Sequence, residues 1–249
     1  MRKFLLTPTS KVLKYAILLL LWEGAARLAG NPLIFPGIGP VFRAFLVICR
    51  DDRPVIFRTL RDLILSFSFS LLAALALSLC AVRSKSVRGL LSPIFSLVNA
   101  TPSVILIILV MIWGDAALVP FTISAAVLIP ILCGGFLDAL DVNELEIGDI
   151  CRVYRITGWQ RIRFVDLPGI FHRFSAQFPA TATLNLKLLV SAELLAQKSA
   201  SIGGKIFFSK LYLETASIFA WIGVIFLLNQ LLFSLFSVLF VRPLSSSAK

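Results

Sequence analysis

Long stretches without a charged residue divide this sequence into segments. Four of them run for 20 to 27 residues without Asp, Glu, Lys or Arg: 63–82, 89–114, 116–137 and 215–241. An α-helix needs about 20 apolar residues to cross the hydrocarbon core of a bilayer. The pattern therefore predicts four transmembrane helices, at about 60–82, 90–114, 116–138 and 215–241.

Two further apolar segments carry charges and are weaker candidates for spans. In the segment 13–29, Glu23 and Arg27 lie one helical turn apart and can pair. The segment 176–196 is interrupted by two charged residues. With both segments counted, we predict an all-α, polytopic membrane protein of about six transmembrane helices, forming a single domain over 1–249. The basic, then apolar, beginning also resembles a secretory signal peptide, but the apolar segments that follow favour an uncleaved first helix.

Composition supports a membrane protein. Hydrophobic residues make up 58% of the chain, charged residues 15%, and the mean hydropathy is +0.93. These values exclude an ordinary soluble domain. The net charge of +11 comes from basic residues in the gaps between apolar runs. Contact with anionic lipid headgroups explains them more simply than nucleic acid does, so the expected environment is a lipid bilayer and no nucleic acid partner is expected.

The distribution of Lys and Arg predicts the orientation. With both termini inside, the predicted cytoplasmic segments carry 14 Lys and Arg and the outer segments carry nine. This bias favours cytoplasmic N- and C-termini, with positions 86 and 160 inside and 204 outside. The stretch "GPVFRAFLVICRD" at 39–51 is too short to span and is typical of a helix lying at the outer interface.

Signatures of chemistry are absent from the sequence. The four cysteines have no metal-ligand spacing, and His172 is the only histidine. The triplet Gly203-Gly204-Lys205 lacks the rest of a phosphate-binding loop. We therefore expect no catalytic residue, no metal and no cofactor.

The segment 139–173 is polar and basic, unlike its neighbours. We expect it to be a cytoplasmic loop with two short helices, "ELEIGDICRVYR" and "WQRIRFVDLP", joined by a turn at Thr157-Gly158, the second ended by Leu167-Pro168. Such a protrusion fits a groove on a soluble partner. The alternative is a solvated connector, although functionless connectors of this length are uncommon.

The same segment resembles the cytoplasmic EAA loop of the permease subunits of ABC importers. That loop reads Glu-Ala-Ala, three residues, Gly, nine residues, Ile-x-Leu-Pro; here Asp149-Ile150-Cys151, Arg155 and Val165-Asp166-Leu167-Pro168 stand in those slots. Trp159-Gln160 resembles the "RWQ" of the nitrate, sulfonate and taurine branch. Other stretches resemble that branch in order, among them "LLLLWEGAARL", "SAELLAQKSASIGGKIF" and "LYLETASIFAWIGVIFLL".

The resemblance implies a permease subunit of a bacterial inner membrane without catalysis of its own. It implies a second permease copy, an ATP-binding cassette ATPase and an extracytoplasmic solute-binding protein as partners. The residues expected to dock the ATPase are Asp149, Cys151, Arg152, Tyr154, Arg155, Thr157, Gly158 and Trp159. The substrate stays open: nitrate, sulfonates, taurine and vitamin precursors all suit the branch.

Four residues are candidates for the substrate pathway: Lys187, Glu193, Pro102 and Pro130. An intramembrane lysine such as Lys187 either lines an aqueous path, where it favours an anion, or pairs with an acid such as Asp138. Glu193 is a candidate for an outer gate or for a helix end at the interface. Pro102 and Pro130 are expected to kink their helices, in a gated path or as static bends.

Two rival classes are compatible with a polytopic chain. A self-powered secondary transporter or channel predicts inverted repeats or paired broken helices, and neither is evident in the sequence. A membrane-embedded enzyme needs clustered His, Asp, Glu or Cys on facing helices, and the apolar segments contain few of these residues.

Overall fold

Helices form every regular element in the part of the chain that the computed structural model describes, residues 8–175 and 177–236. The elements in order are α1 (Pro8–Ala29), α2 (Ile38–Asp51), α3 (Arg53–Arg83), α4 (Lys85–Ala100), α5 (Ser103–Trp113), α6 (Val119–Val153), α7 (Gly158–Arg161), the π-helix η1 (Ile162–Asp166), α8 (Leu167–Phe174), α9 (Phe178–Leu195), α10 (Ile202–Leu211) and α11 (Thr215–Phe236). The fold is an all-α polytopic membrane protein, as predicted.

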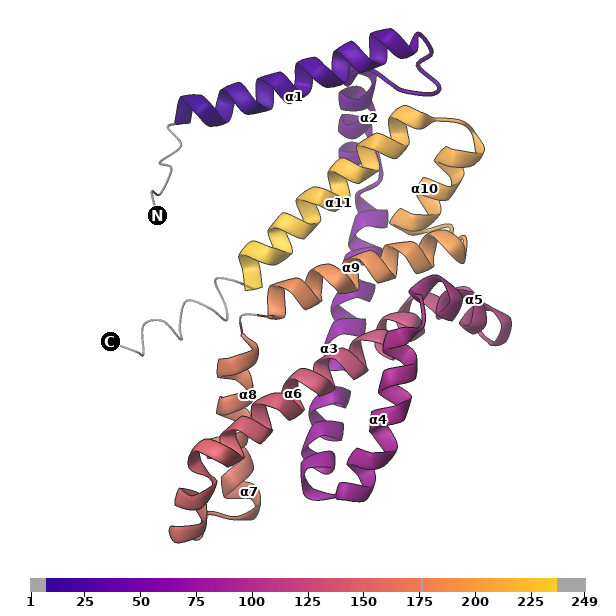
Figure 1. The fold of residues 1–249 in the computed structure, drawn as a ribbon. Coiled ribbons are helices and arrows are strands. Elements are labelled where there is room, and N and C mark those ends of the chain that lie inside the picture. Colours follow the sequence, from indigo (N-terminus) through magenta and orange to yellow (C-terminus); the bar gives the residue numbers. More distant parts are fainter. Residues whose placement is uncertain (1–7, 176, 237–249) are drawn as a thin grey trace.

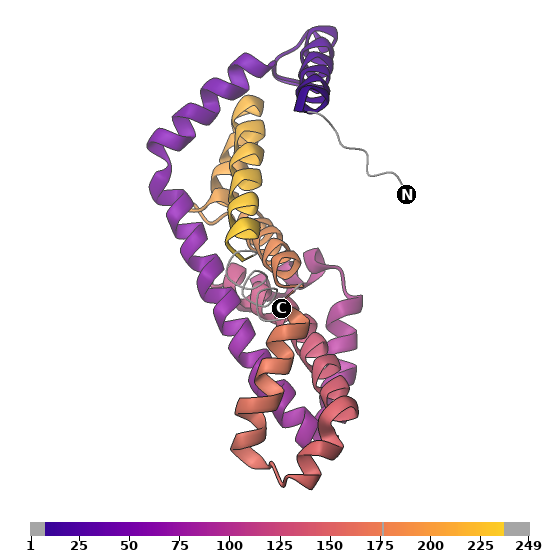
Figure 2. The ribbon, with the colours of Figure 1, turned by 90° about the vertical axis from the view of Figure 1, so that its left-hand side faces the viewer.

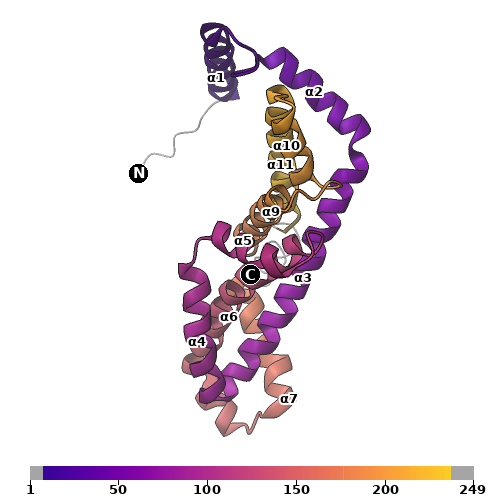
Figure 3. The same ribbon diagram turned by 90° about the vertical axis from the view of Figure 1, so that its right-hand side faces the viewer.

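The helices form an elongated body along the long helix α3 (Figures 1 and 2). One end, called here the polar end, holds the α3–α4 turn, the end of α6, and α7. Near the other end lie α2, α10 and the start of α11, and α1 stands apart from the bundle (Figure 3). The last turns of α1 are held through Trp22, whose indole N–H donates to the Pro36 carbonyl at 3.0 Å. The predicted pairing of Glu23 with Arg27 is confirmed at 3.5 Å.

Three helices in the described ranges are long and apolar enough to cross a membrane, namely α3, α6 and α11. The pair α4 and α5 makes a fourth if counted as one span, although its two helices meet at 106°. α1 and α9 are not in this set, so spans at 13–29 and 176–196 stay predictions. Ala176 and residues 237–241 of the predicted spans lie outside the described residues.

The segment predicted as one helix at 90–114 forms two helices. α4 ends at Ala100 and α5 begins at Ser103, with Pro102 as the residue before its first turn. Proline has no N–H to continue the helical ladder, and it pushes the preceding residue, Thr101, into an extended conformation, here with ψ of 128°. Pro102 therefore breaks the helix instead of kinking it, while α6 continues through Pro130 as one helix.

The predicted start of the polar loop at 139 is wrong. α6 continues to Val153, so "ELEIGDICRVYR" forms its end instead of a separate short helix. The second short helix does not stop at Leu167-Pro168: α8 begins there and continues to Phe174. Pro168 lies in the first turn of α8. Proline is well tolerated there, because its missing N–H would have no helical partner in any case.

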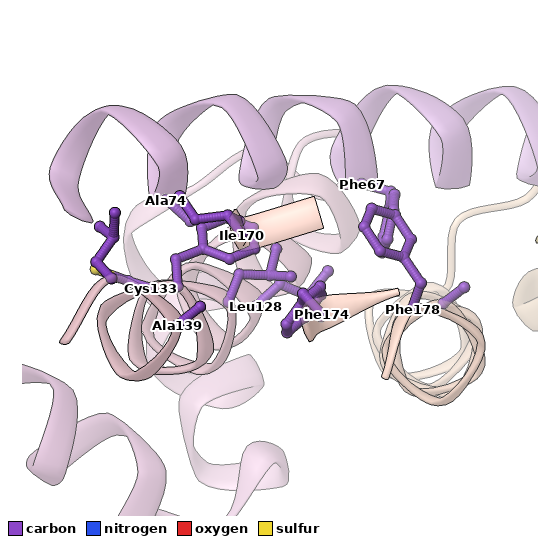
Figure 4. Packing of buried hydrophobic residues seen from close by; sticks show 12 residues of the cluster. Phe67, Ala74, Leu128, Cys133, Ala139, Ile170, Phe174 and Phe178 are labelled. Atoms are coloured by element: carbon purple, nitrogen blue, oxygen red, sulfur yellow. The ribbon is translucent and has the colours of Figure 1, made fainter. Parts of the chain in front are cut away.

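Aromatic packing joins α3, α6, α8 and α9 into one core (Figure 4). The Phe136 and Phe174 rings meet edge-on with centroids 4.9 Å apart, and Phe178 continues the series to Phe67. Gly135 makes room for this contact, since a Cβ there would lie 2.8 Å from the Phe174 ring. This core fixes the polar end against the apolar part of α3.

Asn185 of α9 links three helices through polar contacts. Its amide nitrogen donates to the Leu63 carbonyl of α3 at 3.1 Å and to the Ser66 hydroxyl at 3.4 Å. Its amide oxygen accepts from the Ser124 hydroxyl of α6. Asn185, Ser66 and Ser124 are all fully buried. A buried amide without partners is costly in an apolar environment, so this cluster selects one arrangement of α3, α6 and α9.

Replacement of Asn185 with Leu should lower the stability of the detergent-solubilised protein by about 1–2 kcal/mol, because Ser124 loses its hydrogen-bond acceptor inside the bundle. Thermal unfolding measures this change. The matched control is Asn99→Leu on the exposed side of α4, which should leave the melting temperature nearly unchanged. Equal melting temperatures for Asn185→Leu and wild type would contradict the linking role.

Candidate functional site

The chain reverses direction at the polar end between α6 and α7. α6 ends in a Schellman motif: the Ile156 N–H donates to the Cys151 carbonyl at 2.8 Å, and the Arg155 N–H donates to the Arg152 carbonyl at 3.2 Å. This motif requires a left-handed residue, and Arg155 adopts it with φ of +52°. Glycine is the usual residue there because it has no Cβ to clash, and Arg155 also stands in the slot where the EAA loop has glycine.

Aromatic side chains project from this reversal into the surroundings. Tyr154 is 74% exposed and Trp159 is 69% exposed. Val153 and Phe164 are also exposed beside them. Exposed large apolar groups among charged residues make this surface a candidate for contact with another macromolecule. We call the segment from Asp149 to Trp159 the corner.

Ion pairs tie the two sides of the corner together. The Glu144 carboxylate of α6 accepts from Arg152 at 2.8 Å and from Arg161 of α7 on its other oxygen. Gly148 leaves space for this carboxylate, because a Cβ there would lie 2.9 Å from it. Arg152 also pairs with Asp149 at 2.8 Å. The corner is therefore braced by contacts as well as by its backbone motif.

A cavity of about 930 Å³ lies behind the corner, between α6 and the α3–α4 turn. Arg88 and Asp141 meet at its edge in a two-pronged ion pair of 2.9 and 2.6 Å. Asp166 lines it and is nearly fully buried, with the Arg161 guanidinium 3.5 Å away. Burial raises the pKa of the Asp166 carboxyl above its ordinary value, and the positive charge of Arg161 opposes that shift.

Packing of α8 against α6 holds in place the part of the chain that follows the corner. The Asn143 amide of α6 donates to the Val165 carbonyl of η1 at 3.4 Å. Asn143 reaches that far because Gly169 has no side chain; a Cβ there would lie 1.9 Å from the amide nitrogen. A side chain at position 169 would therefore displace the Asn143 amide from this contact.

The structure brings the eight predicted docking residues together at the corner. Seven of them are exposed, and the eighth, Cys151, is buried beneath the turn. Cys151 lines the cavity instead of the outer surface, so it contributes to the shape of the corner and presents no atom of its own to a partner.

Glu193 lies far from the corner, at the junction of α9, α10 and α3. Its carboxylate accepts from the Thr59 hydroxyl at 3.0 and 3.2 Å and from the Gly203 N–H at 3.1 Å. The side chain is fully buried. Glu193 thus caps the first turn of α10, where helix N–H groups lack partners. The nearby ion pair of Lys198 with Asp62, at 2.7 Å, closes the same junction.

The other three pathway candidates are dispersed. Lys187 lies on an exposed face of α9, and no acidic side chain of the described residues forms an ion pair with it, Asp138 included. Pro130 lines a cavity of about 460 Å³ together with Asp138 and Arg173. Pro102 lies at the break between α4 and α5. The four residues therefore do not form one site within a single protomer.

Glu144, Thr59 and Asn185 were not singled out from the sequence, and neither were the contacts that they make. Glu144 and Arg161 are 17 positions apart, and Thr59 and Glu193 are 134 apart, so sequence spacing offers no signal for either contact. Asn185 was detectable, because an amide inside an apolar helix needs a partner. Asn185 and Lys187 are thus two polar residues, two positions apart, in the same apolar helix.

A comparison with known protein families assigns the chain to one of them. The family described as "Binding-protein-dependent transport system inner membrane component" matches residues 63–246. The chain belongs to this family, and it is the membrane component of a transport system, not an enzyme. A comparison with curated proteins gave no match. The matched range covers the corner, Glu193 and α10, while Thr59 and Asp62 of the Glu193 junction precede it.

Replacement of Arg155 with Gly should raise the stability of the purified protein by about 0.5–1 kcal/mol, because Gly adopts the left-handed conformation without a Cβ clash. Arg155→Ala keeps the clash and should not stabilise. Gln197→Gly tests the same effect at a second position, since Gln197 ends α9 with φ of +53° in the same motif. Thermal unfolding of the three variants measures the effect; a melting temperature for Arg155→Gly at or below that of Arg155→Ala would contradict it.

Proposed function

We propose that the chain is the permease subunit of an ATP-driven importer of a small solute and that the corner docks the ATPase. Membership of a binding-protein-dependent transport family supports the transport role. The observation that carries the docking role is the exposure of Tyr154 and Trp159 on a braced turn. Rigid amphipathic aromatics make good interface anchors because they bury much area with little loss of conformational freedom.

The corner is suited to transmitting movement. A partner that pulls on Trp159 acts on α7, and the Arg161–Glu144 ion pair passes the load to α6. α6 is one helix of 35 residues, about 52 Å long at 1.5 Å per residue, so it connects the corner to the middle of the bundle. Closure of an ATPase pair would then move α6 and open the membrane path alternately to each side.

The remaining parts of the proposal follow the family and the charge distribution. A second permease copy completes the membrane unit, and an extracytoplasmic solute-binding protein delivers the solute. The corner and the 83–88 turn face the cytoplasm, with both termini on that side, in a bacterial inner membrane. The excess of Lys and Arg in the predicted cytoplasmic segments supports this orientation, and the two segments lie at one end of the molecule (Figure 1).

A self-powered secondary transporter or channel is the alternative. The broken pair α4–α5 has the form of a discontinuous membrane helix, which such transporters use in pairs to build binding sites. The described residues contain one such pair. A transporter of this kind has no need for an exposed aromatic corner, which favours the ATP-driven importer.

Replacement of both Tyr154 and Trp159 with Ala should lower co-purification of the ATPase subunit at least tenfold, because both aromatic anchors are lost. Membrane insertion should be unchanged, since neither side chain packs in the core. The matched control replaces Tyr212 and Trp113, which are exposed to 70% and 78% away from the corner. Full co-purification from the Tyr154 and Trp159 double variant would reject the docking role.

A further inference from the structure

The exposed face of α9 differs in character from the exposed faces of its neighbours. On α3 the exposed residues in the apolar part include Ile64, Leu65, Phe69 and Leu72, and α11 exposes Ile222, Phe226, Leu227 and Leu231. Such faces suit contact with lipid. The exposed residues of α9 are Ala180, Lys187 and Ser191, and none of them is a large hydrophobic residue.

These residues lie on one side of the helix. At 100° per residue, Ala180, Lys187 and Ser191 fall within about 40° of one another. Thr183 lies at the edge of the same stripe, and its hydroxyl donates to the Asn229 amide oxygen of α11 at 2.7 Å. We call Ala180, Thr183, Lys187 and Ser191 the α9 stripe. It consists of small and hydroxyl side chains and has a single charge between Thr183 and Ser191.

The position of the α9 stripe excludes an ordinary aqueous surface. Asn185, two residues before Lys187, bonds to α3 at Leu63 and to α6 at Ser124, within the uncharged runs of both spans. Two residues correspond to 200° around a helix, so Asn185 points into the bundle and Lys187 points out of it. Lys187 therefore stands beside apolar membrane segments on the outside of the protomer.

Lipid is a poor neighbour for this charge. Lysines within membrane segments face a protein interior or water, because an ammonium in hydrocarbon loses its hydration. No acid of the described residues forms an ion pair with Lys187. The Glu193 carboxylate instead accepts hydrogen bonds from the Thr59 hydroxyl and the Gly203 N–H. The positive charge of Lys187 is thus uncompensated among the residues that the structure describes.

We infer that the α9 stripe lines a water-filled path and that Lys187 selects an anionic solute there. This inference rests on the proposed transport function and adds the charge class of the solute. Water in the path hydrates the ammonium while the path is empty, and a carboxylate, sulfonate or other small anion is its counter-ion in transit. The Thr183 and Ser191 side chains offer hydrogen bonds on either side of the charge, one turn away in each direction.

Thiol chemistry tests the path without knowledge of the solute. Single cysteines are placed at Ser191, or at Ala180 as a second position, in a chain whose four native cysteines are replaced. The complex with the ATPase is kept in membrane vesicles. Two methanethiosulfonate reagents of similar size are compared, one with a sulfonate and one with a trimethylammonium group. Leu227→Cys on the apolar face of α11 is the control and should not react.

The expected result is reaction at Ser191→Cys with a preference for the anionic reagent. A unit charge at about 6 Å in water changes the ratio of the two rates by roughly tenfold, so the preference should fall by about that factor in Lys187→Gln. No reaction at either stripe position, or a ratio that Lys187→Gln leaves unchanged, overturns the inference. Co-purification of the ATPase from the same vesicles reports separately on the proposed function.

Discussion

The need to satisfy one buried amide in an apolar bundle sets the arrangement of this membrane protein. Asn185 reaches a backbone carbonyl and a hydroxyl of α3 and a hydroxyl of α6, so three helices are held at one level. Non-directional apolar packing leaves a helix free to rotate, but hydrogen bonds do not. With the rotation of α9 fixed by Asn185, Lys187 is held on the opposite side of the helix, facing away from the protomer.

Two further constraints extend from this level toward the two ends. Toward one end, Glu193 caps α10 and accepts a hydrogen bond from Thr59, so α9, α10 and α3 are held together. The close approach of α10 depends on Gly203, where a Cβ would lie 2.4 Å from the Leu194 backbone nitrogen. Toward the other end, α6 runs without interruption to the corner, where Glu144 joins it to α7. The stripe and the corner are thus parts of one connected structure.

The sequence was a good guide where one physical rule dominates and a poor one where distant residues decide. Uncharged runs predicted the apolar spans α3, α6 and α11, because a bilayer imposes a length and excludes charge. The same rule missed the break at Pro102, since hydropathy does not register a proline inside an apolar run. It also ended α6 too early, because charge marks the edge of the membrane and says nothing about where the helix stops.

The candidate site shows the same division. The resemblance to the EAA loop located the corner and identified Arg155 as the residue in the glycine slot, and the backbone of Arg155 has the left-handed conformation that favours glycine. That Cys151 is buried, and that Glu144 braces the corner, depend on how α6 and α7 pack. The exposure of Lys187 follows from the partners of Asn185, which lie 61 and 122 positions away.

Site-specific photo-crosslinking in native membranes tests the central claim, that the corner is where the ATPase binds. A photoreactive amino acid replaces Tyr154 in one variant and Tyr212 in another; the two tyrosines are similarly exposed, at 74% and 70%. Tyr154 ends α6 at the polar end, whereas Tyr212 ends α10, which lies near the other end of the molecule. The account predicts a crosslink to the ATPase subunit from position 154 and none from position 212. A crosslink from position 212 with none from position 154 would contradict it.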